Sequence, residues 1–184
     1  MKHTATMALM LTLAAAGLRA QQTSVNMTFS GDAGASVIDL KYAGTTTGEE
    51  NLAGNGTFGQ FTFRLVKAST ILPQPSLTCF GPTKFFFPNV AGAGLFRFSD
   101  GSLLTVNLTD GGDCIDFGAR EARCTLTFQV TGGTGRFDGA SGTLTLTEAA
   151  APIVSDGSTP PNPVFFTETG EFTGTISRGG NAKP

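Results

Sequence analysis

The side chains that could carry out chemistry in this sequence are mainly carboxylates. The chain has 14 Asp and Glu residues and a single histidine, His3, which lies in an N-terminal segment that resembles a cleavable signal. Without an imidazole, the mature chain cannot form a Ser–His or Cys–His nucleophile or a histidine-rich metal centre. Carboxylate, lysine or tyrosine chemistry, calcium binding and the absence of catalysis all stay open.

Glu168 is the carboxylate that most strongly suggests a role inside the protein. It shares parity with Phe166, Phe172 and Ile176 along a strand-like stretch, so its side chain is expected to face the apolar side. Glu171, three residues further on, faces the other side and cannot pair with it. A buried carboxylate has a raised pKa and could act as an acid or base. We therefore name Glu168 as a speculative catalytic residue, the alternative being a solvated surface carboxylate.

A second acidic group lies in the segment Asp110–Asp113, which reads Asp-Gly-Gly-Asp, with Asp116 close behind. Three carboxylates of this kind could approach a hard cation such as calcium. The spacing matches no calcium loop, however, and acidic, glycine-rich hairpin loops are common without a metal. We therefore predict a hairpin loop here, with no metal ligand and no cofactor.

The three cysteines predict one disulfide and one remaining thiol in an oxidising compartment. We favour a bond between Cys114 and Cys124, because the turn residue Gly118 between them would fold the two flanks into a hairpin with the cysteines opposite each other. A bond between Cys79 and Cys124 is the alternative. The remaining thiol is expected to be buried and unreactive.

The first twenty residues have the pattern of an export signal. Lys2 gives a basic start, the apolar run Ala5–Gly17 follows, and Ala20 precedes polar residues at a position suited to cleavage. The run is shorter than the roughly 20 apolar residues that span a membrane. We predict a signal peptide at residues 1–20 and a secreted or periplasmic protein. An N-terminal core helix or a retained anchor are the alternatives.

The remaining residues, 21–184, are enough for a single domain and too few for two ordinary ones. The formal net charge of the chain is −2, and removal of Lys2 and Arg19 would make it more acidic. Because an acidic chain without a basic cluster repels phosphate backbones, we expect no nucleic-acid partner. We also expect no membrane segment after signal cleavage, and the sequence makes no prediction of the oligomeric state.

Alternating apolar and polar residues predict an all-β fold. In Cys124–Val130, for example, Cys124, Leu126, Phe128 and Val130 face one side and the intervening polar residues face the other. About nine such runs predict an antiparallel β-barrel of about eight strands, with a β-sandwich as the alternative. The weaker runs are Ser24–Phe29, Ser36–Ala43, Lys84–Phe87, Leu95–Phe98 and Val164–Ser177, and the long loops are expected at Ser69–Pro88 and Ala149–Pro163.

The stretch Val130–Gly142, which reads VTGGTGRFDGASG, resembles the glycine-rich turn of dirigent proteins and of related secreted bacterial proteins of the allene oxide cyclase barrel-like group. From the residues alone, Gly132, Gly133 and Gly135 permit a turn, and Phe137 is expected to pack back on the core. The resemblance implies an eight-stranded antiparallel barrel with a hydrophobic interior. Plant members of these families cyclise a lipid epoxide or steer radical coupling without a cofactor. No active residue of theirs can be matched to a position here.

Three functions are consistent with these observations. The 16 phenylalanines suggest a barrel interior that binds a small apolar ligand without catalysis, which is the leading hypothesis. A cofactor-free isomerase or cyclase with Glu168 as its inward carboxylate is the first alternative. A structural or adhesive envelope protein with a filled interior is the second.

Overall fold

The computed structural model describes residues 21–76, 79, 85–159 and 161–178. The predicted signal peptide, residues 1–20, lies outside these ranges. Within them the chain forms nine β-strands and one short 3-10 turn. The elements are β1 Gln21–Ala35, β2 Thr45–Gly56, β3 Phe61–Thr70, β4 Gln74–Pro75, β5 Phe85–Phe98, β6 Leu103–Asp116, β7 Glu121–Gly133, η1 Gly135–Phe137, β8 Ser141–Ser155 and β9 Pro163–Arg178.

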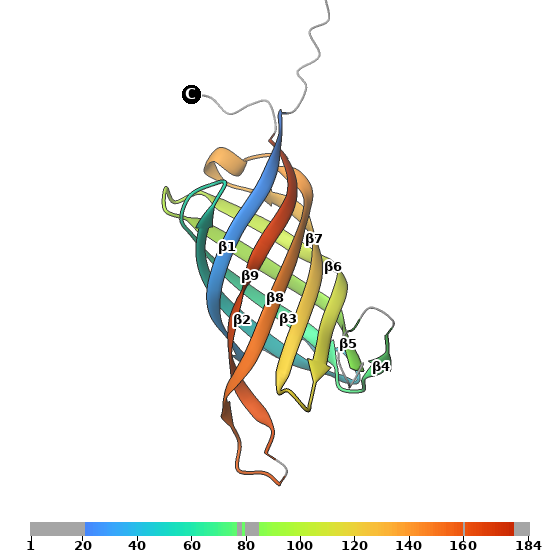
Figure 1. The fold of residues 1–184 in the computed structure, drawn as a ribbon. Coiled ribbons are helices and arrows are strands. Elements are labelled where there is room, and N and C mark those ends of the chain that lie inside the picture. The colour runs from blue at the N-terminus through green and yellow to red at the C-terminus, as the bar shows by residue number, and fades with distance from the viewer. Residues whose placement is uncertain (1–20, 77–78, 80–84, 160, 179–184) are drawn as a thin grey trace, which may run out of the picture.

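Eight of the strands close into an antiparallel barrel (Figure 1). The order is β3-β2-β1-β9-β8-β7-β6-β5, and the pairing of β3 with β5 completes the circle. The two-residue strand β4 pairs with β5 and is not part of the closed circle. The predicted eight-stranded antiparallel barrel is therefore confirmed, and the β-sandwich alternative is wrong. No helix within the described residues is long and apolar enough to cross a membrane.

The two ends of the barrel differ. The end at the top of Figure 1, here called the closed end, carries η1 and the short turns at residues 57–60, 99–102 and 134–140. The end at the bottom, here called the open end, carries the loops at residues 36–44, 117–120, and 156–159 with 161–162. The long β8–β9 hairpin projects from the open end (Figure 1).

Phenylalanine rings fill the barrel interior towards the closed end. Phe63, Phe96, Phe128 and Phe172 are almost completely buried. The ring centroids of Phe63 and Phe96 are 4.3 Å apart, and those of Phe63 and Phe172 are 5.0 Å apart. At these distances the rings are in contact and leave no space between them for a ligand.

The glycine-rich stretch after β7 closes this end. Phe137 in η1 is completely buried, as predicted. The Arg136 guanidinium lies 4.9 Å from the ring centroid of Phe98 and donates a 2.6 Å hydrogen bond to the carbonyl oxygen of Phe58. A cation over an aromatic face is attracted to it. Arg136 therefore covers the aromatic rings at the closed end and ties η1 to the turn at Phe58.

The sequence prediction missed β2, Thr45–Gly56, and placed a strand at Ser36–Ala43 instead. That prediction is wrong, because residues 36–44 form a loop. In β2 the inward positions are occupied by Gly48, Glu50 and Gly54 as well as by Leu52, so the strand shows little apolar alternation. The loop at 36–44, in contrast, contains exposed apolar residues that imitate a strand.

Two predicted loops are largely strand. Residues 149–155 of the predicted loop Ala149–Pro163 extend β8, with shifts in register between Pro152 and Ser155. Asp110–Asp113, predicted as a hairpin loop, lies inside β6 after a β-bulge between Leu108 and Asp110. A bulge inserts one extra residue, which turns the following side chains to the other face of the strand.

The predicted crossover Ser69–Pro88 is correct only in its middle part, where residues 71–73 and 76 lie outside the strands. Residues 77–78 and 80–84 lie outside the described ranges. Pro88 was expected to fall outside a strand, but it lies in β5 and pairs with Gly112. The register between β3 and β5 shifts at the neighbouring pair Ser69–Asn89, and this irregularity accommodates a residue that has no amide hydrogen.

Candidate functional site

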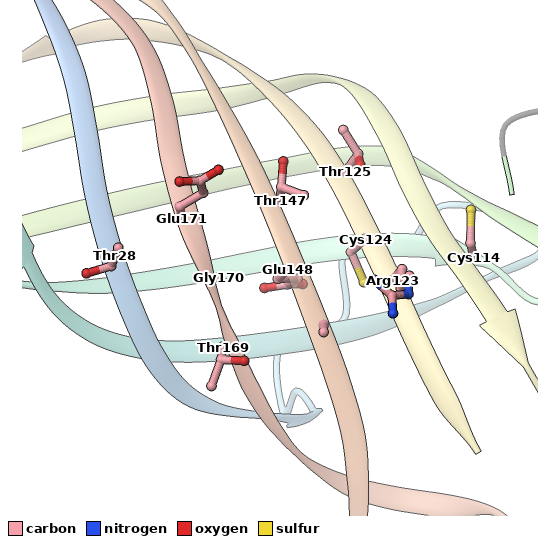
Figure 2. A pocket seen from close by; sticks show the side chains of 11 residues that line it. Thr28, Cys114, Arg123, Cys124, Thr125, Thr147, Glu148, Thr169, Gly170 and Glu171 are labelled. Carbon is pink, nitrogen blue, oxygen red and sulfur yellow. The ribbon is translucent and has the colours of Figure 1, made fainter. Parts of the chain in front are cut away.

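Two of the hollows in the described structure could be the functional site. The larger, about 540 Å³, lies on the outer face of β1, β7, β8 and β9 (Figure 2). Outward-facing side chains such as Thr125, Thr147 and Glu171 line it. Glu148 and Cys124 also border it, but their side chains are buried in the barrel wall and face inwards. This hollow is a depression in the threonine-rich outer surface of the barrel.

The smaller hollow, about 160 Å³, lies inside the barrel at the open end. It combines apolar side chains with charged ones, which is the usual composition of a binding site. Because its charged groups converge, we take this cavity as the candidate site. Its apolar lining consists of Ala33, Ile115, Ala122, Ala150 and Phe166, and its charged lining includes Glu50, Lys67, Asp113 and Glu168.

Strand parity explains why charged side chains point into the barrel here. On β2, β3 and β8 the last buried leucine is followed, two residues nearer the open end, by a charged residue of the same parity, and on β7 it is followed by Cys124. Successive inward positions therefore change from apolar to polar at one level of the barrel. We call this level the carboxylate layer; it consists of Glu50, Lys67, Asp113, Cys124, Glu148 and Glu168.

Lys67 is the cation of the carboxylate layer. Its Nζ lies 2.7 Å from Oε1 of Glu50 and 3.0 Å from Oδ1 of Asp113. Burial opposes the charge of Lys67, but Asp113 and Glu50 outweigh this effect and raise its pKa well above the ordinary value. Lys67 is therefore protonated and binds β3 to β2 and β6 inside the barrel.

Three glutamates come together beside this ion pair. Carboxylate oxygens of Glu50, Glu148 and Glu168 lie within 4.8 Å of one another, and the exposed fractions of these residues are 1, 3 and 3%. Burial, and then the negative charge of Glu50, raise the pKa of Glu168 to about 8. The same causes raise the pKa of Glu148 well above its ordinary value. Like charges and poor solvation thus oppose ionisation of this group.

Several of these oxygens have no hydrogen-bond partner among the described residues. They are Oε2 of Glu50, both carboxylate oxygens of Glu148, and Oε2 of Glu168. Oε1 of Glu50 also lacks a well-directed hydrogen bond, but it is ion-paired with Lys67. Because buried polar atoms normally have partners, the group is incomplete as it stands. It could hold protons, a metal ion or the cationic part of a ligand.

The predicted disulfide between Cys114 and Cys124 is wrong, because Cys114 is bonded to Cys79 and Cys124 is free. The bulge in β6 is the physical reason. It turns Asp113 into the barrel and Cys114 towards the outside, whereas Cys124 faces inwards, so the two thiols lie on opposite faces of the wall. Burial raises the pKa of the Cys124 thiol. The expectation of a buried, inert remaining thiol fits this environment.

Some of the other predicted site residues face the barrel interior and some face solvent. Glu168 faces the barrel interior, as its parity indicated, and Glu171 is exposed on the outer face. Asp110, Asp113 and Asp116 do not converge: Asp110 is exposed, Asp113 contacts Lys67, and Asp116 accepts hydrogen bonds from the turn at Gly118. These three carboxylates therefore do not come together at one point.

The sequence analysis did not identify Glu50, Lys67 or the inward orientation of Asp113. For Lys67 a signal existed, because it continues the parity of Phe61, Phe63 and Leu65. Comparison with protein families, curated proteins and solved structures found no significant match for this chain. The functional argument therefore rests on the geometry of the open end.

Proposed function

We propose that the open end of the barrel binds a small ligand, with the polar part of the ligand in the cavity and its apolar part against the rim. The observation that carries this proposal is the distribution of exposed apolar side chains. All the large ones except Val90 lie in the loops and strand ends of the open end, and none lies at the closed end within the described residues. This rim consists of Val37, Ile38, Tyr42, Ile71, Leu72, Phe85, Phe117, Ile153, Val154, Val164 and Phe165.

The size of the cavity suggests which part of the ligand binds inside it and which part binds at the rim. Pockets for whole drug-sized molecules measure roughly 300–1,000 Å³, whereas this cavity measures about 160 Å³. It therefore accommodates a small molecule or the head of a larger one. The apolar part of a larger ligand would bind to the rim, because contact with these side chains removes apolar surface from water. The phenylalanine interior is occupied by its own rings, so we place the ligand at the open end.

The two alternative functions would use the same end. A cofactor-free isomerase or cyclase would need Glu168 to contact its substrate, and Glu168 lines the cavity. An adhesive envelope protein would use the rim for a macromolecule. Both stay predictions, and the cavity with its charged lining favours a small ligand.

We also propose that the chain is exported to the cell exterior or the periplasm. The signal-like N-terminus supports export, as does the Cys79–Cys114 disulfide, since disulfides persist in oxidising compartments. N-terminal sequencing of the protein from an exported fraction, with cleavage expected after residue 20, tests this proposal.

Native mass spectrometry tests ligand binding. Protein purified from its own exported fraction is expected to carry an added organic mass of a few hundred daltons that disappears on denaturation. An Ala150→Phe variant, which places a ring in the cavity, should lose this mass. Ala149→Phe, on the same strand but facing outwards, should retain it. Equal masses in the native and denatured wild-type protein would remove the support for this function.

A further inference from the structure

We propose that Glu50, Glu148 and Glu168 form a binding site for a hard divalent cation, and that Ca²⁺ fits it best. The inference does not rest on the proposed organic ligand. It concerns three carboxylates beside the same cavity, two of which, Glu50 and Glu168, line it, and a cation can bind there whether or not an organic molecule binds at the rim.

The geometry of the three carboxylates is that of a cation site. They come from β2, β8 and β9 and converge so that one oxygen of each lies within 4.8 Å of the others. Three oxygens this close together have a central point no more than about 2.8 Å from each, so small side-chain movements bring all three to the 2.3–2.6 Å at which Ca²⁺ binds oxygens. Mg²⁺ binds at about 2.0–2.1 Å with strict octahedral geometry, and the three oxygens would have to move closer together.

The orphaned oxygens are the second, independent observation. Glu148 is 3% exposed, and neither of its oxygens has a hydrogen-bond partner within the described part of the chain. A buried oxygen that is left unpaired is unfavourable, and a bound cation would coordinate it. Oε2 of Glu168 and Oε2 of Glu50 are in the same situation.

The charge balance points to a cation rather than to an anion or a neutral group. Among the described residues that line the cavity, Lys67 is the one basic side chain, and Glu50 and Asp113 share it. Glu148 and Glu168 feel the charge of Lys67, but neither forms an ion pair with it. Protonation would remove the charge of these two groups and give each a single O–H donor, whereas a divalent cation would supply positive charge and contact an oxygen of all three glutamates at once.

The cavity also leaves room for the further oxygen ligands that a Ca²⁺ ion needs. Three carboxylates leave a Ca²⁺ ion short of its usual six to eight oxygen ligands. A space of about 160 Å³ beside them holds several water molecules, at roughly 30 Å³ each. The ion would enter from the open end and complete its coordination shell with water or with oxygens of a ligand.

Isothermal titration of chelator-treated protein with CaCl₂ tests the inference. We expect one Ca²⁺ per chain, binding below millimolar concentration, with at least tenfold weaker binding of MgCl₂. Glu148→Gln should weaken Ca²⁺ binding at least tenfold, because it replaces a charged ligand by an amide. Glu171→Gln, an exposed residue on the outer face of β9, is the matched control and should bind as the wild type does.

A second measurement keeps the test independent of the variant. Wild-type protein should show a Ca²⁺-dependent rise in its thermal midpoint, with a smaller rise for Mg²⁺. Absence of bound calcium and of any thermal shift at millimolar CaCl₂ would overturn the inference. Unchanged affinity in a folded Glu148→Gln variant would overturn it as well.

Discussion

The closed and open ends of the barrel are built from the same eight strands and follow the same inward–outward alternation, but their inward side chains differ completely. At the closed end these are phenylalanines and leucines in contact with one another. At the open end they are four carboxylates, a lysine and a thiol. A barrel does not need such a polar level in order to fold, because apolar residues of similar volume are usually at least as stabilising. The difference supports our proposal that the open end serves binding, while the packed closed end contributes most of the stability.

The first prediction compares the effect on stability of removing an aromatic ring from each end. Phe96 is completely buried, whereas Phe85, at the start of the same strand, is 40% exposed. Phe96→Ala should lower the free energy of unfolding by about 3–5 kcal/mol, because it leaves a cavity in the core. Phe85→Ala should lower it by less than about 1 kcal/mol. Urea denaturation measures both, and similar losses would show that the ends do not differ in stability.

The second prediction concerns the cation of the carboxylate layer. Lys67→Met leaves Glu50 and Asp113 without their buried partner and should lower the free energy of unfolding at pH 7 by about 3 kcal/mol. Arg64, on the same strand but facing outwards, pairs with Glu49 at the surface. Arg64→Met should lower it much less, because an exposed ion pair contributes little. A loss for Lys67→Met as small as that of Arg64→Met would contradict a tightly held buried pair.

The third prediction is a dependence on pH that originates at the open end. The folded-state pKa of Glu168 is about 8, above its ordinary value of 4.5, and that of Glu148 is also raised. A group whose pKa rises on folding stabilises the protein fully at low pH, and this contribution is lost as the pH rises through the folded-state pKa. The free energy of unfolding of metal-free protein should therefore fall between pH 5 and pH 8, by an amount on the order of 2 kcal/mol.

The charged groups around Glu168 that set this dependence are Glu50, Lys67, Asp113 and Asp32. Denaturation of Glu168→Gln across the same pH range should show a flatter profile, whereas Glu171→Gln should keep the slope of the wild type. A stability that stays constant or rises from pH 5 to pH 8 in the wild type would show that these carboxylates are not held in an unfavourable environment.

The smallest expected effect on stability is at the rim. Phe165 is 39% exposed, so Phe165→Ser should change the free energy of unfolding by less than about 0.5 kcal/mol. The same change should weaken binding of the neutral apolar dye Nile red, measured by fluorescence, because it removes part of the apolar rim. Thr169→Ser, on the outer face of the same strand, is the control. Equal dye binding by both variants would argue against the rim as a binding surface.

The sequence predicted the closed end better than the open end. Strict alternation, as in Cys124–Val130, predicted the barrel and the inward direction of Glu168, and Phe137 was correctly placed in the core. These predictions succeeded because burial on one face leaves a period of two in the sequence.

At the open end the same rule failed for physical reasons. The strand β2 was missed because Gly48, Glu50 and Gly54 occupy inward positions where apolar residues are expected. The bulge at Leu108–Asp110 then inverted the parity of β6, which turned Asp113 inwards and separated Cys114 from Cys124. A bulge leaves no clear mark in a single sequence. Neither the ion pair of Lys67 with Asp113 nor the disulfide of Cys79 with Cys114 could therefore be deduced from spacing.

The central claim is that the carboxylate layer at the open end serves binding at a cost in stability. The most direct test is to denature Glu148→Gln and wild-type protein with and without CaCl₂. Without calcium at pH 8, we expect the variant to be the more stable, because an amide requires neither a buried negative charge nor the uptake of a proton on folding. With calcium, we expect the wild type to gain stability and the variant to gain little. If the variant is less stable than the wild type under both conditions by the same amount, Glu148 supports the fold and the claim is wrong.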